Sequence, residues 1–243
     1  MNGEEDARRV RIAITGLLGF ASAEEQVLLT AAPPEEEGNP QHWAALPVVA
    51  HNTELKCQQV QRLLAIGHGR VPPEFDEVDH TSGELYLRYA GQAPDHVAAE
   101  SNRASDELIS GLRSVGADDL FDPSRNPWLK GRQLWLQIVV RGFWHPTGHL
   151  LDYYLDHGQP DQAVAMATQA LATARYLGVP DEACGMASYN LACARAKAGQ
   201  LDDAVAAARE AISLNPALRG KVATEPDLAA LRGAGLLEPA DRS

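Results

Sequence analysis

Two histidines four residues apart, His145 and His149, are the strongest candidates for chemistry in this 243-residue chain. On one helix, residues at this spacing lie on the same face one turn apart, so a single metal ion can bind both imidazoles. A third histidine, His51, falls in a different predicted helix, and packed helices can direct side chains at one point. The spacing therefore predicts a metal site formed by these three histidines, with at least one coordination position left open.

A divalent ion in such a site would supply a nucleophile at neutral pH. It lowers the pKa of a bound water from about 15.7 to roughly 7, and it activates a thiol in the same way. Glu54 lies one turn beyond His51 and is our candidate for a proton acceptor or a partner of the ligands. Three imidazoles suit several metals, of which we expect zinc or nickel ahead of iron or manganese.

Plainer interpretations of the same residues stay open at this point. His51 can be a half-exposed helix residue, with His145 and His149 hydrogen-bonded in ordinary packing. Glu54 can be a solvated surface carboxylate. Cys57 lies six residues after His51 and about 240° round the helix, so we nominate it neither as ligand nor as nucleophile. The chain's four tryptophans could line a pocket, but their types and spacing favour the core.

The elements that must position these residues are all predicted to be helices. Apolar spacing of helical period and breaker residues predict long helices at residues 10–30, 43–66, 96–115 and 131–157, and a short helix around 84–89. No window alternates like a β-strand, so no sheet is expected. Four long helices joined by loops suit an antiparallel, up-and-down bundle, in which Asp95 is expected to cap the third long helix.

Two features complicate the predicted site. Pro146 lies between the paired histidines, so we expect a kink there, softened because Gly142 occupies the position that the proline ring would meet. The main apolar seam of the second helix is predicted to run from Leu46 to Leu64. His51 projects away from that seam, so the site must lie on a second buried face or at one end of the bundle.

Beyond residue 157 the chain becomes rich in alanine and similar to itself. Residues 158–163 (GQPDQA) match residues 199–204 (GQLDDA) at an offset of 41. This segment resembles the tetratricopeptide repeat, with alanine in place of its usual bulky aromatics, and residues 225–232 are expected to form a capping helix. The residues at that repeat's expected spacings are Leu191, Ala192, Gly199, Ala204, Ala208, Ala211 and Pro216.

Residues 8–157, approximately, resemble the DinB-like (YfiT-like) superfamily of metal-dependent enzymes. The phrases that carry the resemblance are residues 43–51 (WAALPVVAH) and 144–150 (WHPTGHL), with one histidine in the second helix and an H-x3-H pair in the fourth. The resemblance implies that His51, His145 and His149 are the metal ligands. It also implies a small-molecule substrate and a low-molecular-weight thiol, because characterised relatives include bacillithiol S-transferases and mycothiol-dependent isomerases.

Composition and charge limit the alternatives. A net charge of −12 disfavours binding to nucleic acid or to anionic membrane surfaces, and phosphate-binding glycine motifs are missing from the sequence. Short apolar runs and an acidic N-terminus predict a cytoplasmic protein without a membrane span. We thus expect a metal-binding bundle at residues 1–157 and helical repeats at 158–243. The competing hypothesis is a non-catalytic scaffold whose repeats bind a protein partner or a second copy.

Overall fold

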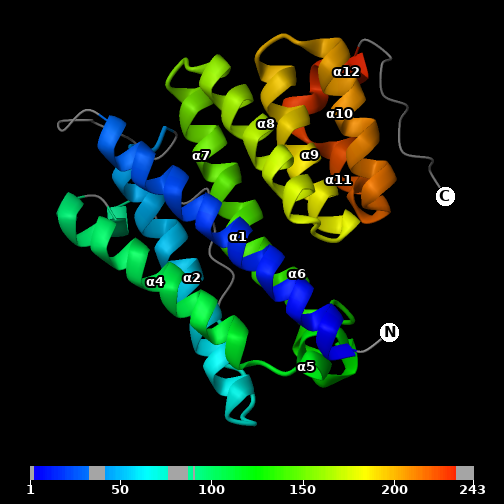
Figure 1. Ribbon diagram of the computed structural model, residues 1–243. Coiled ribbons are helices and arrows are strands. Elements are labelled where there is room, and N and C mark those ends of the chain that lie inside the picture. Colours follow the sequence, from blue (N-terminus) through cyan, green and yellow to red (C-terminus); the bar gives the residue numbers. More distant parts are fainter. Residues whose placement is uncertain (1–2, 33–41, 76–86, 90, 234–243) are drawn as a thin grey trace. The chain divides into compact units, whose positions relative to one another are not determined.

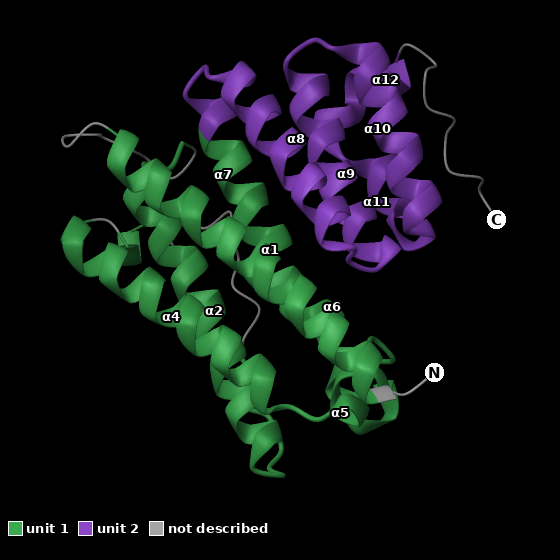
Figure 2. Ribbon diagram, viewed as in Figure 1, with its two compact units in different colours: residues 1–153 green, residues 154–243 purple. Residues whose placement is uncertain are grey.

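The computed structural model describes residues 3–32, 42–75, 87–89 and 91–233 (Figure 1). Every regular element in these ranges is a helix, which confirms the all-α prediction for this part of the chain. The chain divides into two compact units, Met1–Tyr153 and Tyr154–Ser243 (Figure 2). This division falls inside the helix that carries the paired histidines, whereas the predicted boundary at residue 157 follows the end of that helix.

Unit 1 is built from long helices that share one apolar core. Its helices are α1 (Gly3–Ala31), α2 (Ala45–Gly67), α4 (Pro94–Ser114), α5 (Ala117–Phe121), α6 (Leu134–Val139) and α7 (His145–Asp156). Helices α1, α2 and α4 pack against one another, and α1 and α2 also pack against the segment between α6 and α7. The core side chains include Ile14, Leu17, Leu63, Leu108 and Phe143, each no more than 1% exposed. Burial of side chains of this size is the main stabilising term in such a fold.

Helix α2 is buried on most of its circumference, so the predicted seam is only part of its buried surface. Val49, Thr53 and Val60 of the seam are at most 6% exposed, but Leu64 at its end is 47% exposed. On the other face Val48, His51 and Leu55 are at most 3% exposed. The apolar pattern did not predict this second buried face, because several buried positions on α2 are polar. A pattern of apolar residues cannot indicate such positions, since it scores them as surface.

Helix α4 begins two residues earlier than predicted, at Pro94. Asp95 does not cap it: the helix starts at Pro94, the capping position is Ala93, and no side chain caps the free amides. Proline suits the first helical position because its missing N–H would lack a helical acceptor there. Asp95 instead lies in the first turn, where a carboxylate interacts favourably with the helix dipole.

The helix expected at residues 131–157 is continuous but changes its winding before the histidines. Helix α6 passes into a π-helical segment, η3 (Val140–Trp144), which passes directly into α7. The wider turn accommodates Pro146 at the second position of α7, so the strain expected at this proline is absorbed just before it. Gly142 has a further role, because a Cβ atom there would lie 2.1 Å from Leu18 Cδ2 and 2.9 Å from Leu108 Cδ2.

Helix α1 is long and apolar enough to cross a membrane, judged by length and composition alone. The sequence analysis predicted no such segment, because α1 contains no long uninterrupted apolar run. A core helix of a soluble protein passes the same test. Here Ile14, Leu17, Leu18 and Leu28 of α1 are buried within unit 1, with at most 2% of each side chain exposed.

Unit 2 consists of helices in which alanine replaces larger core residues. Its main helices are α8 (Pro160–Leu177), α9 (Asp181–Lys197), α10 (Leu201–Leu214), α11 (Arg219–Thr224) and α12 (Ala229–Gly233). Helix α9 packs against both α8 and α10. The alanines that recur at the offset of 41 residues are at most 3% exposed, namely Ala163, Ala167, Ala170, Ala204, Ala208 and Ala211. The expected capping helix is a 3-10 turn, η5 (Pro226–Leu228), followed by α12.

Candidate metal centre

Three histidines from two helices converge in unit 1. His51 projects from the second turn of α2, and His145 and His149 lie one turn apart on α7. The Nε2 atoms of His145 and His149 are 2.8 Å apart, and Nε2 of His145 is 3.5 Å from Nε2 of His51. One nitrogen from each ring can be chosen so that all three lie within 4.8 Å of one another. The structure therefore brings together the three residues that the sequence singled out.

This arrangement fits a single divalent ion. A tetrahedral site with bonds of ~2.0–2.1 Å to nitrogen places its ligand atoms about 3.3–3.4 Å apart. The observed separations of 2.8 and 3.5 Å lie on either side of this value, so small rotations of the rings suffice. Imidazole nitrogen is a preferred donor for zinc, nickel, copper and iron. Three such donors leave a position for a substrate or water.

The burial of the three rings is unequal. His51 is 1% exposed, so the interpretation of this residue as a half-exposed helix position is wrong. His145 and His149 are half-buried. A metal held by these rings would be closed off on the α2 side, and solvent or a substrate would approach it from the side of α7.

Two aromatic rings flank the imidazoles. Trp43 lies edge-on to His51, with 5.8 Å between ring centroids, and parallel to His149 at 6.5 Å. Tyr89 lies 5.9 Å from the ring of His51 and 6.4 Å from that of Trp43. Trp43 is half-buried beside the site, so the general assignment of tryptophans to the core is wrong for this one. These rings limit the directions in which His51 and His149 can turn.

Glu54 contacts the hydroxyl of Tyr89, whose ring lies beside His51. Its carboxylate accepts hydrogen bonds from the hydroxyl of Tyr89, from Arg88 Nη1 at 3.2 Å and from Gln58 Nε2 at 3.3 Å. The pKa of Tyr89 is raised, first by burial and then by its hydrogen bond to the Glu54 carboxylate. Glu54 is 31% exposed and thus only partly solvated. The geometry connects it to His51 through the ring of Tyr89.

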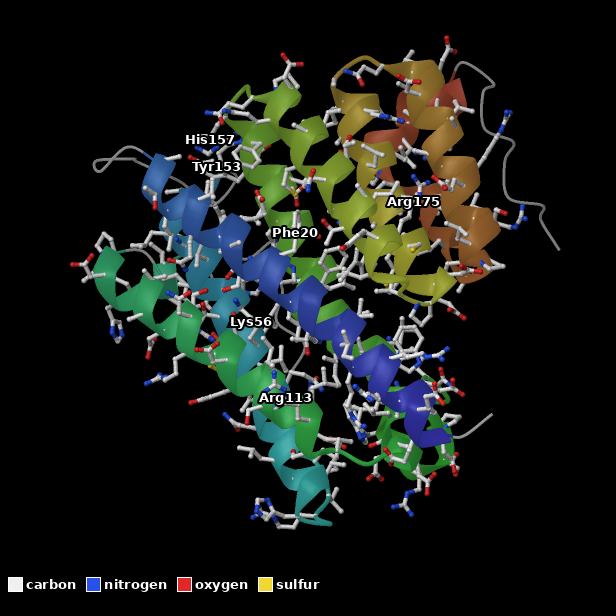
Figure 3. All side chains as sticks on the ribbon, in the orientation of Figure 1. Phe20, Lys56, Arg113, Tyr153, His157 and Arg175 are labelled. Atoms are coloured by element: carbon white, nitrogen blue, oxygen red, sulfur yellow. The ribbon has the colours of Figure 1, made fainter. Side chains whose placement is uncertain are left out.

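A second polar cluster lies further along α2 and involves no histidine. Lys56 Nζ is 2.6 Å from Glu25 Oε2 of α1, and it also donates to the hydroxyls of Ser101 and Ser105 on α4. The Lys56 side chain is 3% exposed and that of Glu25 is 0% exposed. Figure 3 labels Lys56 where α2 lies beside α4. Ser101 donates to the same Glu25 oxygen at 2.7 Å. This cluster joins three helices and balances its own charge.

Two buried amides on α2 belong to neither cluster. The side chains of Asn52 and Gln59 are 0% exposed, and neither makes a hydrogen bond with another described residue of the protein. A buried polar group without a partner costs about 1–3 kcal/mol of stability. These amides explain why an apolar pattern could not predict the buried faces of α2.

Cys57 is not one of the residues whose possible ligand atoms converge at the candidate centre. Its thiol is half-buried, and its pKa is raised first by burial and then by the carboxylates of Glu107 and Glu100. A raised pKa lowers the fraction of reactive thiolate at neutral pH. Cys184 and Cys193 are buried in unit 2.

Tyr89 and Arg88, which hold Glu54, are not predicted from the sequence as part of the site. They lie 35 and 34 residues after it, in a segment whose helix was predicted only as a short piece. That prediction falls partly outside the described residues, among which 87–89 are helical. No spacing relates these residues to Glu54, so only the fold could identify them.

Comparisons with protein-family models, with curated proteins and with solved structures find no match for this chain.

Proposed function

We propose that this chain is a divalent-metal-dependent enzyme of the DinB-like class, acting on a small molecule with the help of a low-molecular-weight thiol. The observation that carries the proposal is the convergence of His51, His145 and His149, with ligand nitrogens within 4.8 Å. The resemblance of residues 43–51 and 144–150 supports the class. The proposed metal site draws its ligands from α2 and α7 alone. The proposal for this site therefore requires neither a four-helix bundle nor tetratricopeptide-like repeats.

In this proposal the three imidazoles hold the ion in their neutral forms. An ion bound there supplies a Lewis acid that lowers the pKa of a thiol or water. The reaction is thiol transfer: the thiol sulfur forms a bond to an electrophilic carbon, and the leaving group departs with the electron pair of its bond. In the related isomerisation the thiol adds to a double bond and is later eliminated.

The residues around the histidines have separate roles in this scheme. Glu54 is the candidate partner of the ligands, because its carboxylate holds the Tyr89 hydroxyl beside His51, and Arg88 neutralises its charge at 3.2 Å. The thiol proton leaves to solvent on the half-buried side of the histidines. Tyr89 holds the Glu54 carboxylate on one side and limits the rotation of the His51 ring on the other. Trp43 stacks beside His149 and presents an apolar face to a substrate that approaches the half-buried histidines.

Metal analysis of the untagged full-length protein tests the first part of the proposal. We expect close to one equivalent of zinc or nickel per chain, and a loss of that metal in the His149→Ala and His51→Ala variants. His96→Ala is the matched control, because this histidine is exposed at the start of α4. Metal that is absent from the wild type, or equally present in all variants, would contradict the site.

A conjugation assay tests the second part. The metal-loaded protein is mixed with bacillithiol, mycothiol or cysteine and with the electrophile monochlorobimane, and the fluorescent thioether is followed. We expect one of the thiols to react faster than in the absence of protein, and the rate to fall to background in His149→Ala. Stoichiometric metal without any such rate would overturn the reaction class and leave the metal site intact.

A further inference from the structure

Arg62, in the C-terminal half of α2, is a buried cation that the proposed chemistry does not use. It is 7% exposed, and it belongs neither to the histidine cluster nor to the cluster around Lys56. It lies eleven residues after His51, which is about 16 Å along α2 at ~1.5 Å per residue. The guanidinium of Arg62 is therefore a feature separate from the candidate metal centre.

Two aromatic side chains present their faces to this guanidinium. Cζ of Arg62 lies 4.8 Å from the centroid of the Phe75 ring and 5.0 Å from that of the Trp128 ring. The negative potential of a ring face attracts a cation, but the ring itself carries no net charge. Phe75 and Trp128 thus hold the guanidinium in place and leave its charge unbalanced.

Most of the N–H donors of Arg62 are unused within the described part of the chain. Nε donates to the backbone carbonyl of Pro73 at 3.4 Å, which is long for a hydrogen bond of this type. Nη1 and Nη2 donate to no described residue, and neither is completely shielded from solvent. These two nitrogens carry all but one of the N–H groups of a guanidinium. The outer edge of Arg62 is thus available to an acceptor from solution.

No carboxylate among the described residues balances the charge of Arg62. Its pKa is lowered, first by burial and then by the positive charge of Arg141, and no acidic group raises it. The side chain of Arg141 makes other interactions, so it is a neighbouring charge and not a donor in this argument. A guanidinium nevertheless stays protonated at neutral pH. A buried charge of this kind is costly unless an anion pairs with it.

The surroundings of Arg62 favour a small organic carboxylate over other anions. The in-plane N–H groups of a guanidinium match the two oxygens of a carboxylate in a bidentate pair. A carboxylate also carries one negative charge, which balances the one charge of Arg62, whereas a phosphate group carries about −1.5 to −2 at neutral pH. Phe75 and Trp128 are only half-buried, so part of each ring can contact the carbon skeleton of the acid.

We propose that Arg62 anchors a binding site for the carboxylate of a small organic acid, with Phe75 and Trp128 beside the carbon skeleton of that acid. Nη1 and Nη2 donate to the two carboxylate oxygens, and the bound anion balances the buried charge. The site shares no residue with the three histidines. The proposal therefore rests neither on a bound metal nor on the proposed reaction.

Titration of the full-length protein with benzoate tests the proposal, because benzoate combines a carboxylate with an apolar ring. Saturation-transfer NMR gives the dissociation constant, with benzamide as the neutral probe of the same shape and inorganic phosphate as the more highly charged probe. We expect saturable binding of benzoate, and binding of benzamide and phosphate that is weaker by at least about tenfold. Benzoate should also shift the indole N–H resonance of Trp128, which the Trp128→Phe variant assigns.

Variants of Arg62 locate the binding. Arg62→Gln should weaken benzoate binding by at least about tenfold, and Arg62→Lys by more than about threefold, because lysine keeps the charge without the planar fork. Arg70→Gln is the matched control at an exposed arginine just beyond α2, and it should change the affinity by less than twofold. His149→Ala should leave benzoate binding unchanged, and Arg62→Gln should leave the bound metal unchanged. Each proposal can thus fail without the other.

Several results would overturn the proposal. They are a lack of saturable benzoate binding, equal binding of benzamide, tighter binding of phosphate, and an unchanged affinity in Arg62→Gln. If circular dichroism melting shows that Arg62→Gln is unfolded, an unshifted Trp128 resonance in the wild type has the same meaning.

One further result concerns carboxylates of the chain itself, because Asp76 and Glu77 follow Phe75 in the sequence. The double variant Asp76→Asn/Glu77→Gln removes both charges. We expect it to bind benzoate as the wild type does. Benzoate binding that appears only in this variant would mean that the chain supplies the anion for Arg62, and the proposal of a ligand site would be wrong.

Discussion

Helix α2 carries two buried polar clusters that differ in one respect. The cluster around Lys56 contains a cation, an anion and two hydroxyls that bond to one another. The cluster around His51 contains three imidazoles whose ring nitrogens converge on one point. The first cluster is complete in itself, because its opposite charges neutralise each other. The second has its possible ligand atoms directed at a common point, so it is suited to bind a metal ion.

The largest expected effect comes from breaking the balanced cluster. Lys56→Met leaves Glu25 buried beside two hydroxyls without its counter-charge, so we expect the free energy of unfolding to fall by about 3–5 kcal/mol. The double variant Glu25→Leu/Lys56→Met should recover most of that loss, because it removes both charges together. Urea denaturation measures both, with Lys130→Met as the exposed lysine control. A small loss in the single variant would show that the pair is not truly desolvated.

The stability conferred by the histidine cluster should depend on bound metal. At a zinc concentration 100 times Kd we expect the wild type to gain about 2.7 kcal/mol of stability, because only the folded state holds the three rings together. His149→Ala and His51→Ala should gain little under the same conditions, and His96→Ala should behave as the wild type. Thermal melts with and without zinc provide the measurement. An equal gain in His149→Ala would place the bound zinc elsewhere.

The Tyr89 ring beside His51 should make a smaller contribution to metal affinity. Tyr89→Phe keeps the aromatic ring but removes its hydrogen bond to Glu54, so we expect metal affinity to fall by about tenfold. Competition with a coloured chelator measures this change. Tyr176→Phe is the control, since that residue is 91% exposed in unit 2. An unchanged affinity would mean that the Tyr89 ring keeps its position without the hydrogen bond.

The smallest effect concerns the buried amides of α2 that belong to neither cluster. Gln59→Leu removes two polar atoms without partners, so we expect the protein to become more stable by about 1 kcal/mol. Gln61→Leu, at an exposed position of the same helix, should change the stability by less than about 0.5 kcal/mol. Urea denaturation compares the two. A destabilised Gln59→Leu would show that bound water or a ligand satisfies this amide.

Much of the helical framework and the three convergent histidines could be predicted from the sequence. Their spacing is local for His145 and His149, and a helical period fixes their common face. The contribution of His51 required the correct packing of two helices nearly a hundred residues apart, which the sequence indicated only through the resemblance of two short phrases. Which face of α2 is buried could not be predicted, because Asn52, Lys56 and Gln59 break the apolar pattern.

The surroundings of the histidines were less predictable for a different reason. Tyr89 and Arg88 reach Glu54 from a short segment between long helices, and no periodicity relates them. The winding change before Pro146 is a compromise between a proline and the close packing of Gly142 against Leu18, so it depends on a contact with another helix. Local sequence signals contain no record of such contacts.

The π-helical segment Val140–Trp144 sets the angular phase between the two ends of its helix. Residues before it direct Leu134 and Ile138 into the core, and residues after it present His145 and His149 to α2. If these five residues wound as a regular α-helix with none removed, everything downstream would rotate by about 100°, the angle of the one extra residue that the wider turn absorbs. The two histidines would keep their mutual spacing but turn away from His51 together. The direction in which His145 and His149 point therefore depends on five residues, Val140–Trp144, that include none of the three histidines.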